Sequence, residues 1–354
     1  MNKERSHYID VTRAGAGLMI VLSHVCSPLK YVAGEIGLLT WGFFNMIDLV
    51  TGVGVPFFLM ISGKLLLGSS RPESAVDFLK RRTSRVFVPF VAWSVVYAFV
   101  FAHTGKGWPV LFALKNMYWH QTSTHLWFMY VLLGIYLLTP PIRVFVRSAT
   151  QRDLVYVLAL WSGFLVMAFF VNGSESRNLS TKLLGYGGYF VLGLFLDRMV
   201  VSRRTAAVLV MTASGALFLS ALLGSGEMLR DPRHGARFYS HTSPLLALAA
   251  GSLFLAIKAL PFNNLFRWRP NIGRAIRWLG AESYNVYLMH VLFIVALANG
   301  WLGIVLTARS GPSSFVGVPL TFAAVMLLSW TFLNVIRALP MLGRFLTVST
   351  KNSP

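Results

Sequence analysis

Long apolar stretches alternate with short polar segments along the whole chain. An α-helix that crosses the hydrocarbon core of a membrane needs about 20 mostly apolar residues. Ten windows meet this requirement, and they lie near residues 11–29, 42–67, 86–102, 125–142, 154–171, 183–196, 205–223, 244–260, 284–302 and 315–336. The sixth window is short and rich in glycine. The pattern predicts an all-α fold, a polytopic integral membrane helical bundle with about ten transmembrane helices.

The composition supports a membrane protein. Of the 354 residues, 55% are hydrophobic and 12% are charged, whereas a soluble domain carries about 25% charged residues. The mean hydropathy of +0.62 excludes a water-soluble globular protein and also a disordered chain. We therefore expect a single membrane domain over residues 1–354, with its core at about 8–340, no cleavable signal peptide and no fused soluble domain.

The distribution of positive charge predicts the orientation. The net charge is +20, from 32 Lys and Arg against 12 Asp and Glu. Cytoplasmic loops of membrane proteins are enriched in Lys and Arg. Placing the N-terminus in the cytoplasm puts 21 of these cations in inner segments and 9 in outer segments, with Arg13 and Lys64 inside the windows. Ten spans with both termini in the cytoplasm satisfy this bias. The same bias explains the excess of positive charge, so we expect no nucleic acid as a partner.

The first window carries two ionisable side chains on one face of the predicted helix. Arg13 and His24 are eleven residues apart, and this spacing corresponds to three full turns plus about 20° and to about 16 Å along the axis. Asp10 and Gly17 fall on the same side. Ionisable groups within a span are costly and commonly functional. A membrane-interface anchor for Arg13 and an interhelical hydrogen bond for His24 are the alternatives.

Other windows carry further candidates. Asp48 lies at the predicted depth of His24, where a carboxylate can orient an imidazole; the alternative is an acid at a helix N-terminus, which the helix dipole favours. The remaining polar and aromatic candidates lie at or within the fourth and ninth windows, and they are His125, Trp127, Tyr287 and His290. For these side chains an interfacial or packing role is the alternative to catalysis.

Motifs of soluble enzymes and metal sites do not occur in the sequence. It has no Walker loop, no Gly-x-Ser-x-Gly elbow and no His-Glu-x-x-His helix. The histidines are scattered and Cys26 is the single cysteine. We therefore expect no metal, no internal disulfide and no permanently bound cofactor.

Several segments together resemble the acyltransferase-3 family of integral membrane acyltransferases, and they occur in the order of that family. The matching segments are Tyr8-Ile9-Asp10 with Arg13 and His24, Val55-Pro56 with Phe58 and Ser62-Gly63, Lys80-Arg81-Arg82 with Arg85-Val86 and Pro89, His125-Leu126-Trp127-Phe128, and Ser283-Tyr284 with Tyr287-Leu288 and His290. Lys64 departs from the family pattern, in which an aromatic residue commonly follows the Ser-Gly pair.

The resemblance implies a stand-alone O-acetyltransferase of the bacterial inner membrane. Acetyl-CoA on the cytoplasmic side would be the donor substrate, and a hydroxyl of a cell-surface polysaccharide or lipid-linked glycan precursor the acceptor. The residues expected to bind the donor phosphates are Arg13, Arg81, Arg82 and Arg85. His24 would act as general base or acyl carrier with Asp48 beside it, and direct transfer and a covalent intermediate both stay open. Further site candidates are Asp10, His125, Trp127, Tyr287 and His290.

The segment 224–243 is predicted to be an outer loop that contacts the acceptor. It contains Arg230, Arg233 and Arg237 on a side where positive charge is otherwise sparse, and such cations suit an anionic sugar or a lipid-linked diphosphate. A solvated loop without a ligand is the alternative. A membrane transporter or glycolipid flippase is the rival functional class, because buried Asp, Arg and His also serve proton relays.

Overall fold

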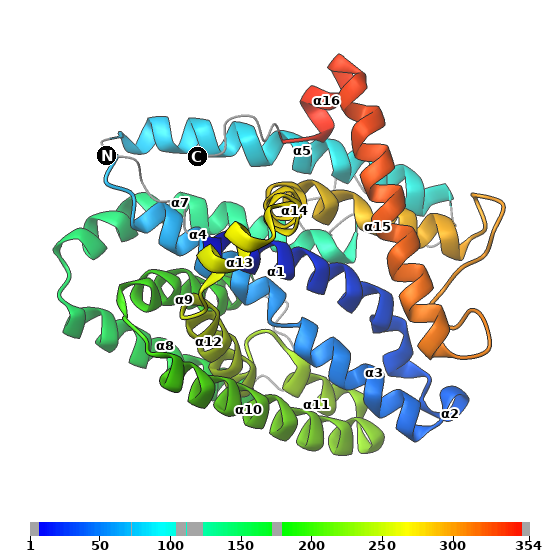
Figure 1. The fold of residues 1–354 in the computed structure, drawn as a ribbon, viewed down its shortest axis with the longest axis horizontal. Helices are drawn as coiled ribbons and strands as arrows, with labels where there is room; N and C mark the ends of the chain where they lie inside the picture. Colours follow the sequence, from blue (N-terminus) through cyan, green and yellow to red (C-terminus); the bar gives the residue numbers. More distant parts are fainter. Residues whose placement is uncertain (1–6, 72, 104–110, 112–122, 172–178, 349–354) are drawn as a thin grey trace. The chain divides into compact units, whose positions relative to one another are not determined.

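The computed structural model describes residues 7–71, 73–103, 111, 123–171 and 179–348 (Figure 1). This part of the chain is helical and contains no strand, and it divides into two compact units. Unit 1 comprises Met1–Ser70 and Pro141–Ser283, and unit 2 comprises Arg71–Pro140 and Tyr284–Pro354.

The helices of unit 1 are α1 (His7–Cys26), η1 (Ser27–Tyr31), α2 (Ala33–Ile36), α3 (Leu38–Thr51), α4 (Gly54–Leu67), α8 (Gln151–Val171), α9 (Leu179–Arg198), α10 (Arg203–Arg230), α11 (Pro232–Ala236), η3 (Arg237–Tyr239), α12 (Pro244–Lys258) and α13 (Phe262–Trp268). Those of unit 2 are α5 (Ala75–His103), η2 (Thr124–Leu126), α15 (Ser314–Ala338) and α16 (Pro340–Leu346). Two helices contribute to both units: α7 (Trp127–Ser148) and α14 (Pro270–Ala298).

All ten predicted windows coincide with helices. Within the described residues, nine helical segments are long and apolar enough to cross a membrane. The prediction of an all-α, polytopic membrane protein is therefore confirmed, while the cytoplasmic position of both termini stays a prediction. The one window that is not among these nine segments is the sixth, 183–196, which lies in α9. Helix α9 packs against α4, α8 and α12. Because protein contacts cover much of its surface, α9 can carry the glycines and polar side chains that lower its hydropathy.

The second window is interrupted between α3 and α4, at Gly52 and Val53. Pro56 follows in the first turn of α4. A proline lacks the N–H group that would bond to the carbonyl of Gly52, so it suits the start of a helix better than an interior. The interruption places Asp48 in the last turn of α3.

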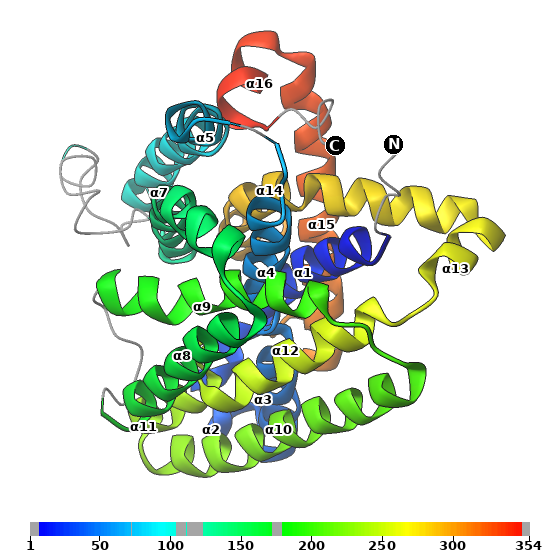
Figure 2. The ribbon, with the colours of Figure 1, turned by 90° about the vertical axis from the view of Figure 1, so that its left-hand side faces the viewer.

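Helices α4 and α9 cross with their backbones in direct contact (Figures 1 and 2). A Cβ atom added to Gly63 would lie 1.7 Å from the carbonyl oxygen of Phe190, and one added to Gly193 would lie 2.0 Å from that of Met60. Glycine is required at both positions for this approach. The Ser62-Gly63 segment of the resemblance therefore has a packing explanation at Gly63.

Helix α1 is packed closely on two sides within unit 1. On the side of α4, a Cβ atom at Gly54 would lie 3.0 Å from the carbonyl oxygen of Ala16. On the side of α14, a Cβ atom at Gly17 would lie 3.0 Å from the Cβ atom of Ser283. Small residues thus fix the position of the helix that carries Arg13 and His24.

Polar contacts hold the elements of unit 2 together. The Trp93 indole donates to the carbonyl oxygen of Leu346 at 3.0 Å, and the Tyr97 hydroxyl donates to that of Leu288 at 2.8 Å. The backbone N–H of Val348 donates to Oδ1 of Asn285 at 2.8 Å. These bonds join α5, α14 and the segment at the end of α16, which also packs on α5.

Candidate functional site

Helix α1 carries both Arg13 and His24 in one continuous run from His7 to Cys26. Both side chains are half-buried. Their spacing places them about 20° apart around the axis and about 16 Å apart along it. The helix therefore has two distinct polar ends, which we call the Arg13 end and the His24 end.

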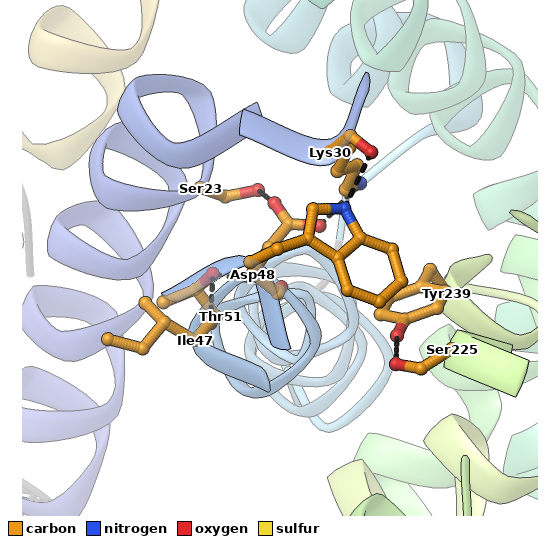
Figure 3. A network of polar contacts seen from close by, with 8 residues as sticks. Ser23, Lys30, Ile47, Asp48, Thr51, Ser225 and Tyr239 are labelled. Carbon is orange, nitrogen blue, oxygen red and sulfur yellow. Dashed lines mark hydrogen bonds and ion pairs between the residues drawn. The ribbon is translucent and has the colours of Figure 1, made fainter. Parts of the chain in front are cut away.

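Asp48 is the central side chain at the His24 end (Figure 3). It is 5% exposed, and Oδ1 accepts a hydrogen bond from the Ser23 hydroxyl at 2.7 Å while Oδ2 forms an ion pair with Lys30. His24 interacts electrostatically with Asp48 and Lys30. The structure thus brings His24 and Asp48 together, as their predicted depths suggested.

The position of Asp48 in α3 corrects one alternative reading of this residue. It lies in the last turn of α3, not at a helix N-terminus. The negative end of the helix dipole disfavours a carboxylate there, so the helix does not explain the acid. Lys30 and Ser23 supply the compensating positive charge and hydrogen bond.

Lys30 contacts three side chains, those of Asp48, Trp41 and Tyr239. The Trp41 indole donates to the Lys30 carbonyl oxygen at 2.9 Å. The Lys30 ammonium lies 5.7 Å from the ring centroid of Tyr239, and the Tyr239 hydroxyl is 2.8 Å from Oγ of Ser225. Figure 3 shows the ion pair of Lys30 with Asp48 and, separately, the hydrogen bond between Tyr239 and Ser225.

A second imidazole, His241, interacts electrostatically with His24. Its Nδ1 lies 3.3 Å from the Tyr186 hydroxyl, and its backbone oxygen accepts a hydrogen bond from Tyr189 at 2.6 Å. Both tyrosines belong to α9. Sequence reasoning placed His241 in the 224–243 segment but gave no reason to pair it with His24.

The prediction that 224–243 is a loop is wrong over much of its length. Helix α10 continues to Arg230, and α11 and η3 follow. The Ser220 hydroxyl donates to the carbonyl oxygen of Phe238 at 2.7 Å, and Gly224 packs against Phe238 and Tyr239. The segment is therefore folded back on α10, and it delivers Tyr239 and His241 to the His24 end.

The three predicted acceptor arginines have different environments. Arg230 is exposed, with Glu227 4.0 Å away. The Arg237 guanidinium lies over the rings of Phe169 and Phe238, at 5.0 and 5.3 Å. The side chain of Arg233 lies outside the described part of the structure.

The Arg13 end contains Asp10 and a cluster around Asp197. Asp10 is buried on α1. Asp197 accepts a hydrogen bond from the Tyr8 hydroxyl and forms an ion pair with Lys64 at 2.5 Å, while the Lys258 ammonium donates to carbonyl oxygens at the end of α9. The cluster joins α1, α4, α9 and α12. Its ion pair with Asp197 gives a structural role to Lys64, the residue that departs from the family pattern.

Asp197 lies outside the nine candidate spans, and its charge follows from these partners. Burial raises the pKa of the carboxyl, but hydrogen bonds from Lys64 and Tyr8 and the positive charges of Lys64 and Lys258 outweigh burial, so the pKa lies below its ordinary value. The group is therefore ionised at neutral pH.

In unit 2, three predicted residues form one buried group. His125 and His290 have ring centroids 5.3 Å apart, and the Tyr287 hydroxyl donates to the carbonyl oxygen of His125. His125 Nδ1 is 2.7 Å from the Ser123 hydroxyl. Trp127 is half-buried, with its ring 5.9 Å from that of Phe128.

The predicted donor arginines of α5 form a second cluster in unit 2. Arg81 pairs with Glu73 at 2.5 Å, and Arg82 interacts electrostatically with Arg81 and Arg85. The predicted site residues are thus divided between the units: Asp10, Arg13, His24, Asp48, Arg230, Arg233 and Arg237 belong to unit 1, and Arg81, Arg82, Arg85, His125, Trp127, Tyr287 and His290 belong to unit 2. Among the described residues, no group of three His, Cys, Asp or Glu side chains is arranged to hold a metal ion.

The chain matches a known family model. The model Acyl_transf_3, described as an acyltransferase domain, matches residues 6–334. No curated protein and no solved structure matches the chain.

Proposed function

The chain belongs to the Acyl_transf_3 family of acyltransferases, and from this premise we propose that it is an O-acetyltransferase of the bacterial inner membrane. It transfers the acetyl group of cytoplasmic acetyl-CoA to a hydroxyl of a cell-surface polysaccharide or a lipid-linked glycan precursor, of the type modified by the enterobacterial common antigen O-acetyltransferase. Membership in an acyltransferase family gives no support to the transporter or flippase alternative.

The geometry of α1 carries this proposal. Thirteen bonds join the inner phosphorus of CoA to its sulfur through the pantetheine arm. At the extension of a peptide backbone, which gains about 3.5 Å for every three bonds, this arm spans about 15 Å. The separation of Arg13 and His24 along α1 is about 16 Å. A donor whose diphosphate is bound by Arg13 therefore presents its thioester at His24.

The groups at the His24 end suit acetyl transfer to an alcohol. The imidazole takes the proton of the acceptor hydroxyl as its oxygen attacks the thioester carbonyl. The C–S bond breaks, and the proton passes from His24 to the departing thiolate, which gives the acetyl ester and free CoA. A covalent acetyl-His24 intermediate gives the same products in two steps. Asp48, fixed by Ser23 and Lys30, stabilises the imidazolium in either route.

The function is tested by mass spectrometry of surface glycans from a host strain that lacks the gene. Restoring the gene should restore acetyl esters that are absent from the deletion strain. Identical acetylation in the two strains would contradict a role in glycan modification.

Arg13 is expected to act on the donor. Arg13→Ala and Arg13→Lys should each raise the apparent KM for acetyl-CoA in proteoliposomes by about 10- to 100-fold, because a guanidinium grips a phosphate through two charge-assisted bonds and a lysine does not. The acceptor KM should stay unchanged. Arg203→Ala, at an exposed arginine of α10, is the matched control. If both Arg13 variants keep the wild-type KM for acetyl-CoA, Arg13 does not bind the donor and serves only as an anchor at the membrane interface.

The acceptor is expected to bind from the outer side, near α11. Replacing Arg230, Arg233 and Arg237 together with glutamine should raise the acceptor KM and leave the acetyl-CoA KM unchanged.

The side of the membrane on which α11 lies is tested separately with the substitution His234→Cys, at an exposed position of α11, in a Cys26→Ser background. An impermeant thiol reagent should label it in intact spheroplasts. Labelling only after the membrane is opened would place this segment in the cytoplasm and overturn the route.

A further inference from the structure

Helix α13 and the first turns of α14 carry a high density of positive charge. No acidic residue occurs from Pro232 to Ala281. Four arginines of this stretch lie in or next to α13 and in the first turns of α14, and we call them the α13–α14 arginine cluster: Arg267, Arg269, Arg274 and Arg277. The first three are exposed and Arg277 is half-buried.

Arg277 is held in a defined position at the junction of these helices. Its guanidinium carbon lies 5.8 Å from the ring centroid of Phe266. Phe266 is buried, and its ring meets that of His7, at the start of α1, edge to face at 4.8 Å. A Cβ atom at Gly273 would lie 3.1 Å from a terminal nitrogen of Arg277, so glycine leaves room for the guanidinium there.

The α14 part of the cluster lies near the Arg13 end of α1. A Cβ atom at Gly280 would lie 3.7 Å from the Cβ atom of Arg13, and Ser283 packs on Gly17. Over this short stretch, later residues of α14 therefore contact later residues of α1. Arg277 precedes Gly280 by almost one turn, which places it on the side of Arg13 that faces away from His24.

We propose that the α13–α14 arginine cluster binds the 3′-phosphate of the CoA donor. This inference rests on the proposed function. Because the pantetheine arm takes up the length between Arg13 and His24, the adenosine end of the donor must lie beyond Arg13, on the side of Arg277. Guanidinium groups bind a phosphate dianion through paired, charge-assisted hydrogen bonds. The phosphate of an anionic lipid headgroup offers the same chemistry, so the test separates the two sources.

The test uses the full-length protein in phosphatidylcholine nanodiscs, which contain no anionic lipid. The apparent KM is measured for acetyl-CoA and for acetyl-3′-dephospho-CoA. The wild type should favour acetyl-CoA by about tenfold or more. The double variant Arg274→Gln/Arg277→Gln should lose this preference, because its KM for acetyl-CoA should rise while its KM for acetyl-3′-dephospho-CoA stays unchanged. The double variant Arg203→Gln/Arg204→Gln, at exposed arginines of α10, should keep the preference.

A second measurement uses the wild type alone and does not depend on the folding of a variant. Adenosine 3′,5′-bisphosphate should compete with acetyl-CoA about tenfold more strongly than adenosine 5′-monophosphate. Equal inhibition by the two nucleotides, or an unchanged donor preference in the Arg274→Gln/Arg277→Gln variant, overturns the proposal. A variant effect that appears only when phosphatidylglycerol is added assigns the cluster to lipid and also overturns it. Failure of the proposed function has a different signature, because the wild type would then turn over neither donor.

Discussion

Replacing His24 with alanine is expected to lower the rate of acetyl transfer by about 10²–10⁴-fold, which is the usual contribution of a positioned general base. This imidazole lies on α1, where it interacts electrostatically with Asp48, Lys30 and His241. His24 is half-buried and α1 is packed through small residues, so removal of the ring leaves the helix contacts in place. The rate is measured as CoA thiol release by purified protein in proteoliposomes.

The control for this variant is His103→Ala, at an exposed histidine at the end of α5. It should retain the wild-type rate. Gel filtration should give the same monodisperse peak for both variants. A His24→Ala protein that is folded and transfers acetyl groups at near the wild-type rate would remove His24 from the mechanism.

Replacing Gly63 with alanine is expected to destabilise the protein by about 3 kcal/mol or more. The added Cβ atom would lie 1.7 Å from the carbonyl oxygen of Phe190, far inside van der Waals contact, so α4 and α9 would have to move apart. The atoms of Phe190 that the added Cβ would meet belong to the backbone of α9, so they cannot move away as the end of a flexible side chain could. The thermal unfolding midpoint in detergent is the measurement.

Gly187 provides a matched control on α9 itself. A Cβ atom there would have no atom within 4 Å. Gly187→Ala should therefore be neutral or stabilising by up to about 1 kcal/mol, because alanine has the higher helix propensity. Glycine-to-alanine substitution is thus expected to lower the free energy of unfolding at Gly63 and to leave it unchanged or raise it at Gly187. An unfolding midpoint for Gly63→Ala equal to that of the wild type would contradict the described crossing of the two helices.

The sequence predicted the helices better than it predicted their surroundings. Apolar windows depend on local composition, so all ten could be located. Helix α9 is the one predicted span that is not a candidate membrane span among the described residues, and its neighbours include α4, α8 and α12. A hydropathy average over a window cannot distinguish a helix that contacts lipid from one that contacts protein. The 224–243 segment looked like a loop because its polar residues suit solvent, whereas packing on Ser220 and Gly224 makes it fold back on α10.

The candidate site shows the same division between local and distant information. Helical periodicity alone placed Arg13 and His24 on one face, and depth alone placed Asp48 near His24. Lys30 and His241 could not be assigned in this way. The position of Lys30 depends on η1 and on the bond from Trp41, and that of His241 depends on two tyrosines of α9. These contacts come from the tertiary fold and leave no periodic signal.

The most direct test of the central claim is reconstitution of acetyl transfer. Purified protein in proteoliposomes receives acetyl-CoA together with surface polysaccharide from a host strain that lacks the gene. We expect the wild type to release CoA thiol and to form acetyl esters on the polysaccharide in equal amounts, and the folded His24→Ala variant to form neither. Folded wild-type protein that leaves both acetyl-CoA and the polysaccharide unchanged would contradict the account.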